Sequence, residues 1–202
     1  MTIREIVPVT KQKSRVVTDE DLSFVLYKGE LSRYGLEAGR ELPPAIFEEI
    51  YREILVKRAK MRAMHLLTRA DYTETALRRK LDQGGYTPGA VEEAVAYVKG
   101  WHYLDDARYA RNYLEAVRGR ESRRRAESKL MEKGVSRQIL KDLAEEDGGE
   151  PETGMILELL QKKCPDPEAA DDAQKRRLYG WLARRGFRNE DILGVFRSYF
   201  GG

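Results

Sequence analysis

The chain has 202 residues, 41% hydrophobic and 35% charged, with a net charge of +3, so it can bury a core while much of each helix faces water. No apolar run reaches 18 residues and the first residues lack the apolar stretch of a secretory signal, which argues against a membrane or secreted protein. Cys164 is the single cysteine, which excludes an intrachain disulfide and favours a reducing, cytoplasmic setting.

Residues 1–44 form a β-rich N-terminal extension in this interpretation. Leu22, Phe24 and Leu26 alternate with polar or less buried types at the period of a strand, and residues 15–18 and 3–9 are further strand candidates. Two or three short strands are not stable alone in water, so we expect them to dock on another part of the chain. The first long helix, which begins at Pro44-Ala45 and continues to residue 67, is the expected surface.

From residue 45 onward the sequence predicts helices, arranged as a repeated pattern. An apolar frame broken by one glycine occurs three times, offset by 49 and then by 52 positions. Its members are Leu77, Leu81, Gly85, Tyr86, Val91 and Ala94; Ala126, Leu130, Gly134, Val135, Leu140 and Leu143; and Leu178, Leu182, Gly186, Phe187, Ile192 and Val195. A fixed period of this size is typical of stacked supersecondary units.

The predicted fold is therefore mainly α, with three tandem three-helix repeats in an elongated, curved array and a small N-terminal β-hairpin region. The expected repeats cover residues 45–104, 105–150 and 151–202, with a flexible link at Asp147-Gly148-Gly149-Glu150-Pro151. The segment Asp71-Tyr72-Thr73 is expected to cap one helix, and Thr87 and Ser136 are expected to cap two others. The frame glycine is expected to end each middle helix in the left-handed conformation.

No group of residues predicts catalysis, a cofactor or a metal. Asp105-Asp106 and Asp171-Asp172 are interpreted as helix-start residues, because neighbours on a helix do not face each other. His65 and His102 lie in unrelated contexts without a nucleophile nearby, and Cys164 reads as a loop or helix-end residue. The chain is therefore not expected to be an enzyme.

An aromatic segment and a basic segment are the strongest candidates for binding. Trp101-His102-Tyr103 suggests base stacking, but an aromatic filling between two repeats is favoured. Residues 57–141 carry 20 Lys and Arg against 11 Asp and Glu, whereas residues 1–56 and 142–202 have net charges of −2 and −4. Basic residues recur at one place in all three repeats: Arg78, Arg79, Lys80, Arg118, Arg120, Arg124, Arg125, Lys129, Arg184 and Arg185. A stripe that binds a partner and a face that is merely solvated are equally favoured interpretations of these residues.

Three segments carry a resemblance to a known family. They are the joint Tyr103-Leu104-Asp105-Asp106-Ala107-Arg108-Tyr109-Ala110 and the frame segments Leu130-Met131-Glu132-Lys133-Gly134-Val135 and Leu182-Ala183-Arg184-Arg185-Gly186-Phe187. Together with the repeat they resemble the RecX regulatory family, and the N-terminal strands are similar to an extension found in some members. The resemblance covers nearly the whole chain.

The resemblance implies a cytoplasmic, non-enzymatic modulator of RecA recombinase that acts on the filament RecA forms on single-stranded DNA. There it would suppress strand exchange, ATP hydrolysis and filament growth. We expect a monomer that needs no cofactor and no membrane, and that meets single-stranded DNA directly or through RecA. Two alternatives stay open: a helical module that binds DNA by itself, and a helical-repeat scaffold for another protein.

Overall fold

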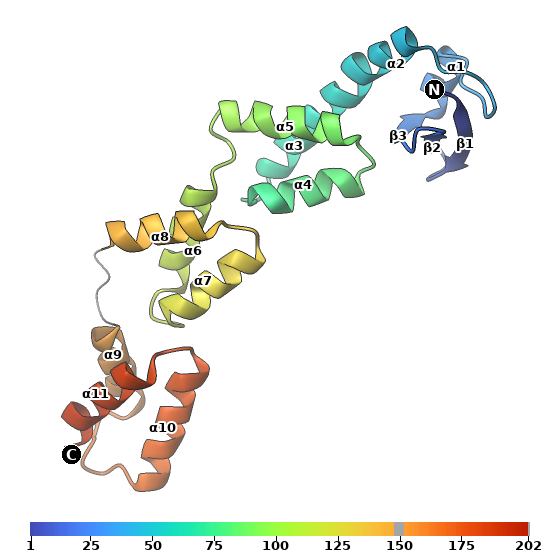
Figure 1. Cartoon of the computed structure of the whole chain (residues 1–202). Helices are drawn as coiled ribbons and strands as arrows, with labels where there is room; N and C mark the ends of the chain where they lie inside the picture. Colours follow the sequence, from blue (N-terminus) through green and yellow to red (C-terminus); the bar gives the residue numbers. More distant parts are fainter. Residues whose placement is uncertain (148–151, 202) are drawn as a thin grey trace. The chain divides into compact units, whose positions relative to one another are not determined.

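The computed structural model describes residues 1–147 and 152–201, and they divide into two compact units that are described separately below. Unit 1 is Met1–Asp105 and unit 2 is Asp106–Gly202. Figure 1 shows a small sheet followed by helices in unit 1 and helices alone in unit 2. The mainly α fold with three three-helix repeats and an N-terminal sheet is confirmed, and no helix of the described residues combines the length and apolarity needed to cross a bilayer.

The N-terminal sheet is an antiparallel meander of three strands in the order β1-β2-β3. The strands are β1 (Ile3–Pro8), β2 (Lys13–Thr18) and β3 (Ser23–Tyr27), and β1 carries an irregularity in register between Ile3 and Glu5. Phe24 and Leu26 are fully buried while Ser23 and Tyr27 are exposed, as the alternation predicts. A short helix that the sequence pattern did not indicate, α1 (Lys28–Arg33), follows β3.

The expected long helix consists of three consecutive helical segments. They are α2 (Pro44–Ile50), the π-helical turn η1 (Tyr51–Val56) and α3 (Lys57–Leu67), and Pro44 occupies the first turn. The residues at both junctions keep right-handed helical dihedral angles, so the path continues through the π turn. The first repeat is completed by α4 (Glu74–Gln83) and α5 (Pro88–Gly100), whose N-caps Thr73 and Thr87 accept hydrogen bonds as predicted.

The sheet and the first repeat share one hydrophobic core, which answers where the N-terminal strands dock. Buried residues of the sheet such as Phe24 pack in the same cluster as Leu55 of η1 and Leu77 of α4. A Cβ added to Gly85, at the turn after α4, would lie 2.5 Å from Cγ2 of Val25 on β3. The sheet therefore packs on the long helix and on the first frame glycine, whose φ is +77°.

Unit 2 contains two further three-helix repeats with separate hydrophobic cores. The second repeat has α6 (Asp106–Val117), α7 (Arg123–Glu132) and α8 (Arg137–Glu146) around Leu130, and the third has α9 (Thr153–Lys163), α10 (Asp172–Arg184) and α11 (Asn189–Phe200) around Leu182. The frame glycines Gly134 and Gly186 have φ of +95° and +92°, which confirms their predicted conformation. Most of the expected link, residues 148–151, lies outside the described residues.

The aromatic segment Trp101-His102-Tyr103 follows α5 near the end of unit 1, and the expectation that it fills the space between two repeats stays a prediction. Trp101 is 63% exposed and Tyr103 is 50% exposed. The Trp101 ring contacts Tyr97 edge-on, with centroids 6.4 Å apart, on the surface of α5. The backbone turns here at His102, which has a φ of +56°.

Candidate partner-binding surface

The three predicted basic residues of unit 1 lie on α4, and they are not equivalent. Arg78 Nε donates to Glu74 (2.9 Å) and its Nη2 donates to Glu92 on α5 (3.1 Å), so this side chain ties two helices together. The hydrogen bond with Glu92 raises the pKa of Arg78, and only 30% of the side chain is exposed. Arg79 and Lys80 are exposed, and they are the residues of this group that a partner can reach.

Two of the predicted residues follow α6 in unit 2. Arg118 lies 3.7 Å from Glu115, and both side chains are more than 70% exposed, so this ion pair is weak and easily exchanged for a ligand. Arg120 is exposed in the turn that leads to α7. Both side chains are therefore accessible.

The α7 helix carries the densest group of predicted residues. Arg124 is exposed on the side away from the buried Ala126 and Leu130, as the helical periodicity predicts. Arg125 and Lys129 share one carboxylate, Glu121, at 3.4 and 2.6 Å. One carboxylate for two cations leaves this face of α7 with excess positive charge.

The structure brings the basic residues of the second and third repeats together where α7 begins and α10 ends. The Ser122 N–H donates to the carbonyl of Arg185 (3.0 Å), and the Arg125 guanidinium donates to the carbonyl of Arg184. A Cβ on Gly186 would lie 2.6 Å from Ser122 Oγ and 2.9 Å from the Arg125 Cβ. Arg125, Arg184 and Arg185 thus lie side by side, and we call this contact the α7–α10 junction.

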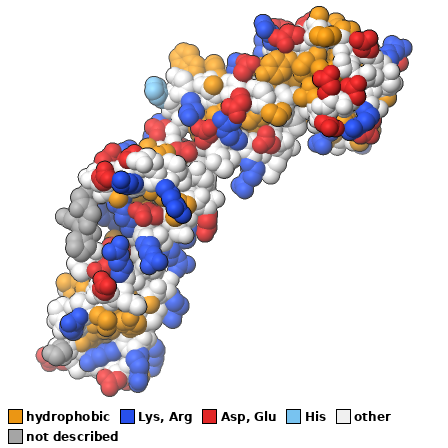
Figure 2. All heavy atoms as spheres, viewed as in Figure 1, with side chains coloured by type: hydrophobic (Ala, Val, Ile, Leu, Met, Phe, Trp, Pro, Cys, Tyr) orange, Lys and Arg blue, Asp and Glu red, His pale blue; other side chains and the backbone are white. Residues whose placement is uncertain are grey.

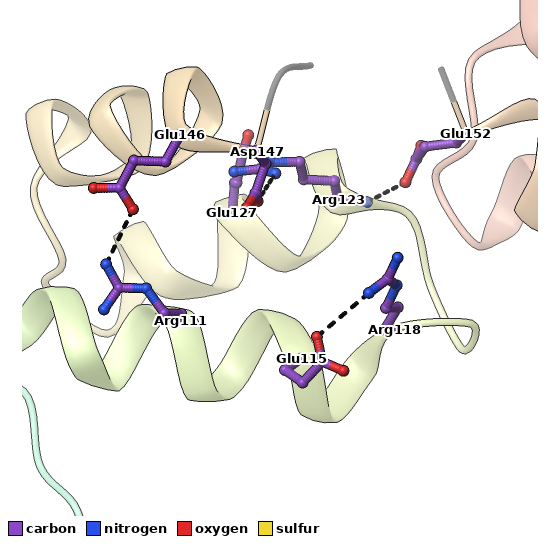
Figure 3. A network of polar contacts seen from close by, with 8 residues as sticks. All are labelled: Arg111, Glu115, Arg118, Arg123, Glu127, Glu146, Asp147 and Glu152. Atoms are coloured by element: carbon purple, nitrogen blue, oxygen red, sulfur yellow. Dashed lines mark hydrogen bonds and ion pairs between the residues drawn. The ribbon is translucent and has the colours of Figure 1, made fainter. Parts of the chain in front are cut away.

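A second set of polar contacts holds the ends of the interrepeat link against α7 (Figure 3). Arg123 pairs with Glu127 (2.8 Å) and with Asp147 (2.5 Å), the last described residue before the link. On the other side of the link, Glu152 accepts a hydrogen bond from the Arg123 N–H (2.6 Å), and burial raises the pKa of Glu152. Arg123 belongs to the basic run of the second repeat but not to the predicted stripe, and its contacts with Asp147 and Glu152 join segments 24 and 29 residues away along the chain.

The third repeat contains three basic residues that are not among the predicted ones: Lys175, Arg176 and Arg177. Together with the predicted Arg184 and Arg185, they make five cations against one carboxylate between residues 172 and 185, on and just after α10. The net charge of −4 for residues 142–202 obscured them, because the carboxylates lie in other segments. Figure 2 shows blue side chains around a hydrophobic patch in this part of unit 2.

The residues weighed as catalytic or metal-binding candidates have structural positions. Asp171 caps α10 by accepting a hydrogen bond from the Gln174 N–H (2.6 Å), and Cys164 is a buried residue at the end of α9. In the described part of the chain no three His, Cys, Asp or Glu residues are grouped to hold a metal ion. The accessible chemistry of the surface is that of arginine, lysine and aromatic side chains.

Comparison with known proteins gives matches at both ends of the helical region. A family model described as the first three-helix domain of RecX matches residues 59–105, and one described as the third three-helix domain matches residues 151–196. "Regulatory protein RecX" of Trichlorobacter lovleyi is 37% identical over 141 residues, which cover 67% of this chain and 92% of that protein. "Regulatory protein RecX" of Caldanaerobacter subterraneus subsp. tengcongensis is 30% identical over 195 residues, covering 95% and 96%.

Solved structures agree at the level of the fold. A crystal structure of regulatory protein RecX superposes with a TM-score of 0.60 at 18% identity, covering 96% of this chain and 98% of that one. RecX from Lactobacillus salivarius gives a TM-score of 0.62 at 14% identity, covering 71% and 96%.

The fold places the chain in the class of proteins built from tandem three-helix repeats. The similarity to proteins over nearly their whole length then places the chain within that class: it belongs to the RecX family. RecX proteins are regulatory proteins and not an enzyme family, so the expectation that the chain is no enzyme is confirmed.

Proposed function

We propose that this protein binds the filament that RecA forms on single-stranded DNA and lowers its activity in strand exchange, ATP hydrolysis and filament growth. It would do so in the cytoplasm and as a monomer, without a cofactor. The relatives are named regulatory protein RecX, which supports a regulatory role linked to RecA. A binding protein changes a polymer without chemistry when it prefers one assembly state, because linkage then shifts the equilibrium toward that state.

The α7–α10 junction is the observation that carries this proposal. Arg125, Arg184 and Arg185, which belong to two repeats, are placed together by hydrogen bonds to backbone carbonyls. Arg124 adds an exposed cation on the same helix as Arg125. A preorganised group of cations on one rigid unit suits an acidic surface, because the entropy cost of gathering the charges has already been met in folding.

The proposed contact set is the predicted one with a refined division of roles. The exposed residues Arg79, Lys80, Arg118, Arg120 and Arg124 would meet the partner directly. Four cations would both contact the partner and stabilise the junction or its surroundings: Arg125, Lys129, Arg184 and Arg185. Arg78 would hold α4 against α5.

The test is inhibition of RecA ATPase on single-stranded DNA by the full chain and by Arg124→Glu. Arg124 is exposed, so its reversal leaves the described hydrogen bonds of the junction in place. We expect the concentration for half inhibition to rise about tenfold or more, corresponding to about 1.4 kcal/mol of lost binding. Lys11→Glu, the same charge change at an exposed turn of the N-terminal sheet, is the matched control and should inhibit normally.

Unchanged inhibition by Arg124→Glu, with an unaltered circular dichroism spectrum, would exclude this face of α7 as the contact. A parent protein that leaves RecA ATPase unaffected over a wide concentration range would refute the proposed function itself.

A direct DNA-binding function is the second candidate, and the cations of α10 favour it. If about six phosphates are contacted, the logarithm of the binding constant should fall with the logarithm of salt concentration with a slope near −5. A flat response to salt would remove this alternative.

A further inference from the structure

We infer that Trp181, together with Arg185, Arg184 and Lys163, forms a binding site for single-stranded nucleic acid on the third repeat, in which a base stacks and the phosphates pair with the cations. The inference deepens the proposed function, on which it rests for the presence of single-stranded DNA. It is argued from four features of the described residues.

The first feature is the contact between the indole and two cations. The guanidinium carbon of Arg185 lies 4.1 Å from the centroid of the Trp181 ring, and Lys163 Nζ lies 5.7 Å from it. Arginine layered on an indole extends a flat surface on which a nucleobase stacks, and arginine planes serve this role in single-strand recognition. The indole itself remains partly exposed.

The second feature is the electrostatic state of these cations. Across the described residues 152–201, no Lys or Arg lies within ion-pair distance of a carboxylate, whereas cations of residues 1–147 form many such pairs. Among the residues that the structure describes, Arg184, Arg185 and Lys163 thus have no carboxylate within ion-pair distance. Unneutralised cations bind phosphates with little cost, because no internal ion pair has to be broken.

The third feature is the fixed position of the two arginines. Their backbone carbonyls accept hydrogen bonds from Arg125 and from the Ser122 N–H, which hold the end of α10 against α7. Gly180 leaves space for the Arg184 side chain, since a Cβ at that position would lie 3.3 Å from Arg184 Nη1. The cations next to Trp181 thus extend from an anchored helix end, and binding has less entropy to remove.

The fourth feature is the contrast with the other tryptophan, Trp101. Trp101 is the more exposed of the two, and no Lys or Arg of the described residues is recorded over its ring. Lys60 lies over the adjacent Tyr97 ring and is paired with Glu93 (3.4 Å), and Lys99, two residues before Trp101, is paired with Glu74 (2.7 Å). An exposed ring between neutralised charges lacks the attraction for phosphate that accompanies stacking in single-strand sites. Trp101 is therefore a built-in control for Trp181.

Tryptophan fluorescence separates the two positions because the chain has only two tryptophans. In the Trp101→Phe variant, which retains Trp181, we expect a 15-mer of thymidylate to quench the emission in a saturable manner. In the Trp181→Phe variant, which retains Trp101, the same oligonucleotide should cause little change. An equal or larger change in Trp181→Phe would overturn the inference.

Affinity is measured by anisotropy of a fluorescein-labelled 15-mer, without RecA. Base–aromatic stacking contributes about 1–3 kcal/mol per base, so Trp181→Ala should bind about 5- to 150-fold more weakly, while Trp101→Ala stays within about twofold of the parent. Arg185→Gln, which keeps the indole, should also weaken binding. An abasic 15-mer has the same phosphates but no bases, so it should compete poorly for the parent protein, about as poorly as the thymidylate 15-mer competes for Trp181→Ala. If the abasic and the thymidylate 15-mer compete equally well for the parent protein, base stacking is refuted.

RecA ATPase inhibition, measured in parallel, separates this inference from the proposed function. Inhibition by the parent protein together with no response of Trp181 to the oligonucleotide overturns the nucleic-acid site and leaves the regulator proposal standing. A response of Trp181 emission to RecA alone, with none to the oligonucleotide, likewise overturns it in favour of a protein contact. A response to the oligonucleotide without inhibition supports the site and counts against the proposed function.

Discussion

Replacement of Gly186 by alanine tests whether the α7–α10 junction holds the second and third repeats together. Gly186 has a φ of +92°, and an alanine Cβ there would lie 2.6 Å from Ser122 Oγ and 2.9 Å from the Arg125 Cβ. The left-handed conformation costs a non-glycine residue about 1–2 kcal/mol, and overpacking adds about 1–3 kcal/mol. We therefore expect the free energy of unfolding to fall by about 2–5 kcal/mol.

Gly119→Ala is the matched control in the same unit. Gly119 has a φ of +73°, but no atom lies within 4 Å of an added Cβ, so this variant carries the conformational cost without the clash. Its expected loss is about 1–2 kcal/mol. The difference between the two variants isolates the contact of Gly186 with Ser122 and Arg125.

The assay is urea unfolding in the Trp101→Phe background, followed by Trp181 fluorescence and by circular dichroism. Because the two repeats have separate cores, a disturbed junction should also separate the fluorescence transition of the third repeat from the helical transition of the whole chain. Equal losses for Gly186→Ala and Gly119→Ala, with coincident transitions in both, would show that the junction contributes nothing to stability.

Two further predictions concern the sheet and the interrepeat link. Gly85→Ala, whose Cβ would lie 2.5 Å from Val25 Cγ2, should destabilise unit 1 by about 2–5 kcal/mol in urea unfolding. Gly35→Ala is the control, because Gly35 has open space at a φ of +60°, and its expected loss is about 1–2 kcal/mol. Equal losses for the two variants would contradict docking of the sheet at the turn after α4. The raised pKa of Glu152 means that the folded protein binds more protons than the unfolded chain, so this group lowers stability as pH rises from its ordinary value of 4.5 through the raised folded value. Glu152→Gln keeps an acceptor for the Arg123 N–H, and its stability relative to the parent should increase between pH 4 and pH 7; a difference independent of pH would contradict burial as the cause.

The contact of Arg123 with Glu152 and the α7–α10 junction together connect the second and third repeats. The second and third repeats have no common hydrophobic cluster in the described residues. Three described hydrogen bonds join them: the Ser122 N–H donates to the Arg185 carbonyl, the Arg125 guanidinium donates to the Arg184 carbonyl, and the Arg123 N–H donates to the Glu152 carboxylate. Each repeat therefore keeps its own core, and the described coupling between the two repeats depends on these hydrogen bonds.

Much of the helical framework could be predicted because it depends on neighbours in sequence. The buried positions Leu77, Leu130 and Leu178 follow from the 3.6-residue period, and the caps at Thr73 and Ser136 follow from side chains that bond the backbone three residues on. The helix α1 gave no such signal, since six residues are too few to establish a period.

The candidate site shows where local reasoning ends. Sequence periodicity identified Arg124 as exposed and the frame glycines as left-handed, because both properties depend on a single helix and its end. Only the tertiary structure decided which cations are neutralised, because their carboxylate partners come from other segments. Arg78 forms an ion pair with Glu92 of another helix. The cations beside Trp181, in contrast, have no carboxylate within ion-pair distance in the described chain. The sequence alone therefore determined the repeats and their charges, and three-dimensional contacts determined which of those charges are paired with carboxylates in the described chain, since Coulomb interactions depend on distance in space and not on separation along the chain.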